Sequence, residues 1–162
     1  MFLNSWLRRC AGLLVGVVVL LGLTACAGLS TEGSPQPTSL WQRLGERPGV
    51  SRVVDRLIDR SAQDPRTRRS FEKTKLAPLK DSLTDYLCKV ADGGCAYEGE
   101  TMANSHAELA IQAHEFDQLV AFLREELDAQ GVATGDKNEL LRRLTADRRD
   151  IVRTGLARKA PW

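Results

Sequence analysis

The sequence predicts an all-α domain, and three observations carry this prediction. Apolar residues recur at helical spacing in four segments after residue 40, glycine or proline signals separate the segments, and no stretch alternates as a half-buried strand does. Short connections join the helices that pair, which favours two antiparallel pairs packed on each other. Residues 40–158 are enough for one domain with one modest core.

Two long helices are predicted in the first half of this domain. The first has an apolar face that starts at Val50 and repeats at offsets 3, 4, 7 and 8. Asp64-Pro65 is expected to end it, because proline disfavours a helical residue before it. The second has an apolar stripe from Leu76 to Val90, with Pro78 in the first turn, where a missing N–H is tolerated. Gly93-Gly94 is expected to end this helix.

Two further long helices and a short one complete the predicted bundle. The third long helix extends from about Glu115 to Gln130, and Gly131 closes it. The fourth starts near Asp136, which we expect to be its N-cap, and its apolar residues continue to Val152. Trp41 lies in a short leading helix that is expected to cap the bundle.

The charge of the chain bears on its partners. The formal net charge is +2, from 23 Lys and Arg and 21 Asp and Glu. Arg8 and Arg9 lie in a leader without acidic residues, so the remainder has 23 − 2 = 21 basic residues against 21 acidic ones. A neutral domain lacks the basic surface that nucleic-acid binding requires first, so we expect no nucleic-acid partner.

Residues 1–25 have the pattern of a secretory signal, with two arginines before an apolar run that is short for a transmembrane helix. The run ends in Leu23-Thr24-Ala25-Cys26, which resembles the lipobox of bacterial lipoproteins. This resemblance implies cleavage before Cys26, lipidation of its thiol, and a membrane anchor facing the periplasm, at the outer membrane by preference, or the cell surface. Residues 26–39 would then be a flexible tether. The alternative is an uncleaved signal anchor formed by Cys10 to Leu29.

Two cysteines remain when Cys10 is lost with the signal and Cys26 carries lipid. Cys88 and Cys95 are an even pair in an oxidising compartment, which predicts a disulfide between them. Covalent cofactor attachment or metal binding are the alternatives. Neither has support from a C-x-x-C-H motif or from a further Cys or His ligand nearby.

The connection between Gly94 and Glu115 holds both histidines of the chain. Loops of this length inside a compact domain are usually functional. Apolar residues follow His106, so we expect it on an inward face, either as a neutral core histidine or as a ligand. His114 directly precedes the third long helix beside acidic residues, which suits a solvated or capping position. A two-histidine metal site is a further alternative, but no H-E-x-x-H pairing supports it.

A dispersed set of residues stands in an order that one protein family shares. The most specific segment is GGCAYEGETMANSHAELAIQAHEF, with Gly-Gly, Tyr-x-Gly and Met-x-x-x-His-x-x-x-x-Ile. The other matching positions are Leu44-Gly45, Gly49-Val50, Val53-Val54-Asp55, Asp64-Pro65, Phe71, Thr74, Leu79, Phe116-Asp117 and Leu123. By these residues the chain resembles the truncated haemoglobins of group 1, from about Leu40 to Val152.

The resemblance implies a globin-like, truncated two-over-two helical sandwich that holds haem b. It implies that His106 is the proximal ligand of the haem iron, and a neutral imidazole is the usual protein ligand of globin iron. His114 matches a position that is not the iron ligand. Tyr97 and Lys75 are candidates to meet the haem propionates.

The resemblance also implies which residues surround the cofactor. Phe71 takes the place of a phenylalanine that packs on the porphyrin, while Leu79 and Leu83 take distal positions on the second long helix. The remaining residues expected to line the pocket are Met102, Leu109, Ile111, Phe116 and Val120.

The sequence departs from the family pattern on the distal side. Many of these proteins hydrogen-bond oxygen through a tyrosine late in the first long helix and a glutamine on the next, and here those positions are Ile58 and Leu83. With Leu79 added, the expected distal pocket has no hydrogen-bond donor. Faster oxygen release and autoxidation than in a tyrosine-bearing relative are therefore expected, whereas carbon monoxide and nitric oxide depend less on a donor.

The resemblance thus implies reversible binding of oxygen, nitric oxide and carbon monoxide, for oxygen transport or gas sensing at the cell envelope, with an unidentified redox partner. One alternative is a haem enzyme, either a nitric-oxide dioxygenase or a peroxidase. Leu79 and Leu83 offer no acid or base for oxygen–oxygen cleavage, which argues against a peroxidase. The other alternative is a haem-free helical lipoprotein that acts as a binding module.

Overall fold

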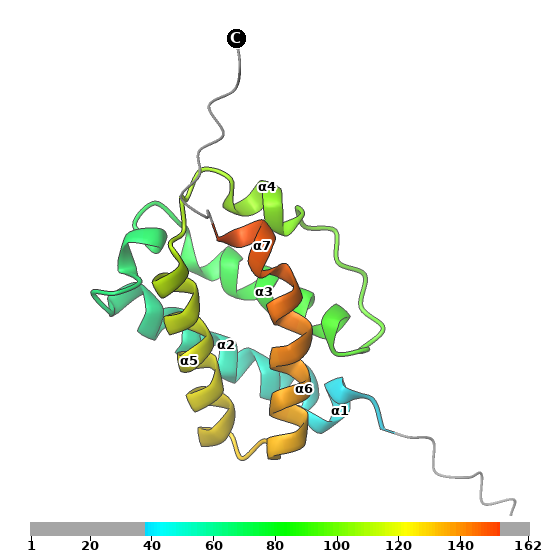
Figure 1. Cartoon of the computed structure of the whole chain (residues 1–162). Coiled ribbons are helices and arrows are strands. Elements are labelled where there is room, and N and C mark those ends of the chain that lie inside the picture. The colour runs from blue at the N-terminus through cyan, green and yellow to red at the C-terminus, as the bar shows by residue number, and fades with distance from the viewer. Residues whose placement is uncertain (1–37, 153–162) are drawn as a thin grey trace, which may run out of the picture. The chain divides into compact units, whose positions relative to one another are not determined.

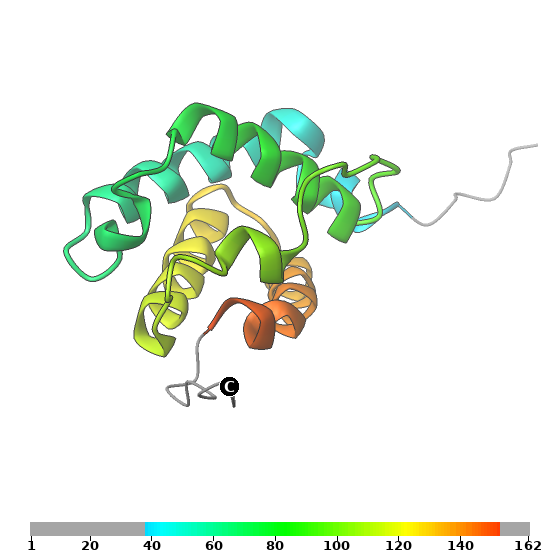
Figure 2. The ribbon, with the colours of Figure 1, turned by 90° about the horizontal axis from the view of Figure 1, so that it is seen from above.

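The computed structural model describes residues 38–152, and all regular structure in this range is helical. Figure 2 shows two layers, with α2 (Glu46–Gln63) and α3 (Leu76–Val90) in one and α5 (Ala113–Ala129) and α6 (Thr134–Leu144) in the other. Helix α2 contacts both α3 and α5, and α5 contacts α6. The predicted all-α fold, built from two helix pairs, is confirmed.

The predicted signal peptide, Cys26 and nearly all of the predicted tether lie outside the described residues, as do residues 153–158 of the predicted domain. Within the described range, no helix is both long enough and apolar enough to cross a membrane.

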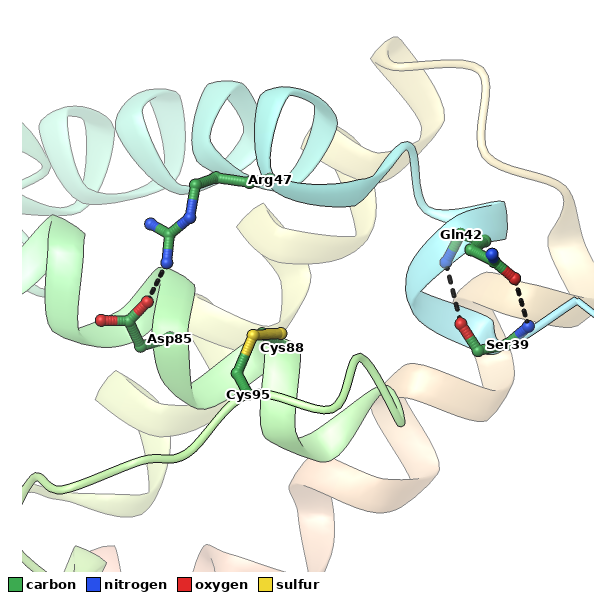
Figure 3. Close-up of a disulfide and its surroundings, with 6 residues drawn as sticks. All are labelled: Ser39, Gln42, Arg47, Asp85, Cys88 and Cys95. Carbon is green, nitrogen blue, oxygen red and sulfur yellow. Dashed lines mark hydrogen bonds and ion pairs between the residues drawn. A yellow bond between two sulfur atoms is a disulfide. The ribbon is translucent and has the colours of Figure 1, made fainter.

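The short leading helix is α1 (Leu40–Arg43), and it packs on the start of the bundle. A capping box holds its N-terminus: the Gln42 N–H donates to Ser39 Oγ at 3.3 Å, and the Ser39 N–H donates to Gln42 Oε1 at 2.9 Å (Figure 3). The buried Trp41 donates its backbone N–H to the Ala91 carbonyl at 2.8 Å, which ties α1 to the end of α3.

Helix α3 is joined to the segment that follows it by a disulfide between Cys88 and Cys95, whose Cα atoms are 5.8 Å apart (Figure 3). Gly93 lies inside the resulting loop, and its N–H donates to the Cys88 carbonyl at 2.8 Å. A Cβ atom on Gly93 would lie 2.5 Å from Cys88 Sγ and 2.8 Å from a ring carbon of Trp41. Only glycine therefore fits here without a shift of its neighbours.

The last helix differs from its prediction at both ends. Ala133 is the N-cap of α6, so the prediction of Asp136 as N-cap is wrong; Asp136 lies in the first turn and accepts a hydrogen bond from Arg43 Nε at 2.7 Å. The helix does not continue to Val152 either. It gives way to the 3₁₀ turn η2 (Thr145–Asp147) and then to α7 (Arg148–Ile151), and the Thr145 hydroxyl donates to the Arg142 carbonyl at 2.9 Å.

The long connection before α5 contains one short helix, α4 (Met102–His106). It lies against α7, next to the ends of the two layers (Figure 1). A second 3₁₀ turn, η1 (Arg68–Phe71), connects α2 to α3 and packs on α2.

Gly93→Ala should lower the free energy of unfolding by about 1–3 kcal/mol, because an added methyl overpacks a filled site against Cys88 and Trp41. Gly135→Ala is the matched control, since Gly135 lies in α6 with no neighbouring atom within 4 Å of the added Cβ. Alanine there should stabilise by roughly 0.5–1 kcal/mol, as expected for a helical position. Urea unfolding measures both values, and equal stabilities of the two variants would contradict the packing described here.

Candidate functional site

A cavity of about 350 Å³ lies within the helical domain, in the size range of sites that hold small ligands. Its wall combines residues of α2, η1 and α3 with residues of α4, α5 and the η2–α7 segment. All but one of the residues expected to surround the cofactor line it: Ile58, Phe71, Leu79, Leu83, Tyr97, Met102, His106, Leu109, Ile111, Phe116 and Val120. The wall is predominantly apolar.

Lys75 is the exception. It is the N-cap residue of α3, its side chain is exposed, and it is not among the residues that line the cavity. Its expected contact with haem propionates stays a prediction.

His106 is the last residue of α4, and two hydroxyls fix this short helix. The Thr101 side chain caps its start by accepting the Asn104 N–H at 3.2 Å, and the Ser105 hydroxyl donates to the Thr101 carbonyl at 2.6 Å. The imidazole Nδ1 lies 2.8 Å from the Met102 carbonyl oxygen. A carbonyl can only accept, so Nδ1 is the donor, and in the neutral imidazole Nε2 then keeps its lone pair. His106 therefore offers the cavity a nitrogen that can bind a metal.

No group of three or more His, Cys, Asp and Glu side chains within residues 38–152 is arranged to hold a metal ion. His114 does not approach His106's cavity: it is exposed, as the second residue of α5, and it does not line the wall. The expected solvated position of His114 agrees with this. The capping residue is instead Gln112, which forms a capping box with Glu115.

The distal side of the cavity is built from branched aliphatic side chains. Ile58 is buried on α2, while Leu79 and Leu83 lie four residues apart on α3 and so share one helical face. None of these three side chains can donate or accept a hydrogen bond or a proton. A ligand bound beside them would meet only apolar groups.

Apart from Tyr97, the hydroxyl-bearing residues of the wall were not anticipated, and five of the seven donate a hydrogen bond to the protein rather than to the cavity. The donors and their acceptors are Thr67 to the Ser61 carbonyl, Ser70 to Glu115, Tyr86 to Asp147, Tyr97 to the Glu100 carbonyl and Ser105 to the Thr101 carbonyl. Burial of a hydroxyl is costly unless it has a partner, which explains the pairing. These five hydroxyls therefore do not offer their protons to the cavity.

Tyr86 is the most informative of these residues. It follows Leu79 and Leu83 at helical spacing, so the sequence could have placed it on the same wall. Its hydroxyl donates to the Asp147 carboxylate, and its ring packs edge-on against Tyr97 with centroids 5.2 Å apart. Burial and then the hydrogen bond to Asp147 raise the pKa of Tyr86 above its usual range. Tyr86 thus stays a neutral hydroxyl that ties α3 to η2.

Glu115 is a buried carboxylate at the edge of the cavity, and sequence analysis did not single it out. It accepts hydrogen bonds from Arg69, from the Ser70 hydroxyl at 3.1 Å and from the Gln112 N–H at 2.8 Å. Burial acts to raise the pKa of Glu115, but the bonds from Arg69, Gln112 and Ser70 outweigh it and hold the pKa below its ordinary value. Glu115 is therefore ionised and paired.

These features define a small helical domain with an apolar internal cavity and one histidine available as a ligand. A family model described as a bacterial-like globin matches residues 39–152. A group 1 truncated haemoglobin of Nostoc sp. (strain MUN 8820) is 31% identical over 108 residues, which cover 67% of this chain and 92% of that protein. The chain therefore belongs to the bacterial-like globin family and is a homologue of the group 1 truncated haemoglobins.

Solved structures of truncated haemoglobins have the same fold. The Fe(III) form of the protein from Tetrahymena pyriformis matches with a TM-score of 0.68 at 23% identity, over 71% of this chain and 98% of that one. The 2/2 haemoglobin from Synechococcus sp. PCC 7002, solved in the cyanomet state with covalently attached haem, matches with a TM-score of 0.67 at 22% identity, over the same shares. The two-over-two helical sandwich is thereby confirmed for this chain.

Proposed function

We propose that the cavity binds haem b and that His106 is the protein ligand of its iron. Membership of the globin family implies haem, and the observation that carries the assignment is the state of the His106 ring. A histidine that binds a metal through one nitrogen usually donates its other N–H to a carbonyl or carboxylate, as His106 Nδ1 does to the Met102 carbonyl. Haem, when bound, would supply an iron that takes a gas ligand, and His106 would hold this iron through Nε2.

The other residues of the wall suit this cofactor. Phe71, Phe116 and Val120 give the porphyrin apolar surfaces, and the partnered hydroxyls do not attract water into the site. An apolar wall would limit the access of water, and of the protons that it carries, to the bound cofactor. The residues of this chain would therefore hold the cofactor, orient the His106 nitrogen that binds the iron and exclude water from the side where the gas binds.

We propose reversible binding of oxygen, nitric oxide and carbon monoxide as the activity, with an apolar distal side formed by Ile58, Leu79 and Leu83. The T. pyriformis protein has also been solved as variants in which a tyrosine and two glutamines are substituted, at positions 25, 46 and 50 of that protein. Their spacings, 46 − 25 = 21 and 50 − 46 = 4, equal those of the three apolar residues here, 79 − 58 = 21 and 83 − 79 = 4. This supports the view that apolar side chains replace the polar set.

Removal of the axial ligand tests the haem site. Wild-type protein reconstituted with haem should show a Soret band with the features of a histidine-ligated iron, and His106→Ala should lose those features. His114→Ala is the matched control, because it removes the only other histidine, which is exposed, and it should leave the spectrum unchanged. A missing Soret band in wild type would favour the haem-free binding module, whereas a spectrum left unaltered in His106→Ala would refute His106 as the iron ligand.

Addition of a donor tests the distal side. Ile58→Tyr should slow oxygen dissociation about ten- to a hundredfold, since a hydrogen bond to a charged acceptor contributes roughly 1.5–3 kcal/mol. Ile58→Phe introduces the same ring without the hydroxyl and separates the effect of size from that of the donor. Stopped-flow oxygen off-rates decide it, and equal rates in the Tyr and Phe variants would refute the apolar distal side.

We also propose that the globin domain is exported and anchored through lipid on Cys26, in continuity with the tether of residues 26–39. The support is the similarity of Leu23-Thr24-Ala25-Cys26 to a lipobox after an apolar leader. Mass spectrometry of the protein from membranes should find an acylated N-terminal Cys26, and Cys26→Ala should appear without lipid and with its leader uncleaved at that position. Unmodified Cys26 in the membrane fraction would instead indicate the signal anchor.

A further inference from the structure

Arg69 and Glu115 connect the two sides of the cavity at one edge. Arg69 lies in η1, next to the cavity residue Phe71, and Glu115 lies in the first turn of α5. The guanidinium donates to both carboxylate oxygens of Glu115, from Nε at 3.1 Å and from the terminal nitrogen at 2.5 Å. The Glu115 side chain is only 5% exposed, so a carboxylate left unpaired there would be strongly unfavourable.

The same guanidinium also holds the segment that leads away from His106. Its terminal nitrogens donate to the Leu109 carbonyl at 3.0 Å and to the Ala110 carbonyl at 3.2 Å. Ala110 has a φ of 47°, a left-handed conformation that is costly for a residue with a Cβ and persists only when its surroundings impose it. Gln112 supports the same carbonyl, because its side-chain amide donates to the Ala110 oxygen at 2.9 Å.

The other hydrogen bonds of this segment are local: the Leu109 N–H donates to the His106 carbonyl at 3.1 Å, and the Gln112 N–H donates to Glu115 at 2.8 Å. Only residues 107–112 separate the end of α4 from the start of α5, and within them Leu109 and Ile111 turn into the wall of the cavity. The strained residue lies between these two. The direction of the backbone at Ala110 decides whether the Leu109 and Ile111 side chains both reach the wall. The Arg69 contacts therefore fix the backbone at this point.

We propose that Arg69 and Glu115 are positioning residues, which form a clamp that holds the 107–112 segment and through it the orientation of His106. The functional part of this proposal rests on haem binding at His106. An ion pair with one exposed partner contributes little by itself, and the Arg69 side chain is 51% exposed. The effect of the clamp comes from geometry. The planar guanidinium of Arg69 donates to the buried Glu115 carboxylate and to two backbone carbonyls at once, and a lysine ammonium cannot do this.

The first test uses haem-loaded protein. Arg69→Leu and Arg69→Lys should release haem to excess apomyoglobin at least tenfold faster than wild type, and the iron–histidine stretching band of the ferrous protein should shift or broaden in resonance Raman spectra. Arg142→Leu is the matched control, because Arg142 is 71% exposed and pairs with Glu139 on the surface. Release rates and an iron–histidine band equal to those of this control would overturn the proposal. Arg69→Lys keeps the charge and remains informative if Arg69→Leu does not fold.

The second test does not depend on haem. Hydrogen exchange of the backbone amides in residues 107–112 should accelerate at least tenfold in haem-free Arg69→Lys and Glu115→Gln, while exchange in α2 and α3 stays as in wild type. Glu108→Gln, a change to an exposed carboxylate of the same segment, should leave exchange unaltered. Unchanged protection of the segment in both clamp variants would overturn the clamp even if haem binds, and absence of haem binding would leave this measurement valid.

Discussion

Polar groups that surround an apolar cavity must find partners within the protein, and this constraint governs much of the structure. Five of the seven hydroxyls in the wall, and its one buried carboxylate, are bonded to a backbone carbonyl, a carboxylate or a donor close by. Had these groups pointed inward unpaired, they would hold water where the fold requires a dry site. His106 stands apart, since one of its ring nitrogens is bonded and the other is left for the cavity.

The hydrogen bonds of these polar side chains also connect elements on different sides of the cavity. Tyr86 on α3 reaches Asp147 in η2, and Arg69 in η1 reaches Glu115 on α5. The Cys88–Cys95 disulfide anchors the segment that brings Tyr97 to the wall and against Tyr86. Each of these connections joins two elements that line the same cavity. The polar groups that are paired within the wall therefore also hold its elements together, in addition to the packing of the helices.

Periodicity and turn signals predict the long helices well, because burial of an apolar stripe is a local property of the sequence. The last helix was predicted as continuous to Val152, but α6 ends at Leu144. In the 3₁₀ turn that follows, the Thr145 hydroxyl donates to the Arg142 carbonyl and Asp147 accepts a hydrogen bond from Tyr86. The apolar wall could be expected from the residues that the chain shares with the group 1 truncated haemoglobins. The pairing of Arg69 with Glu115 could not be expected from the sequence. They are 46 residues apart, and charged residues in a sequence ordinarily indicate a solvated surface. Only the left-handed turn at Ala110 brings the carbonyls of the segment to Arg69.

Haem bound through His106, as proposed, would face a distal side without a hydrogen-bond donor. The infrared stretching frequency of carbon monoxide on the ferrous protein tests it directly, because a donor to the ligand oxygen increases back-donation from iron and weakens the C–O bond. A single band at the high frequency of an apolar environment is predicted, with a downward shift in Ile58→Tyr and none in Ile58→Phe. A low-frequency band in wild type, which Ile58→Tyr does not lower further, would contradict the account.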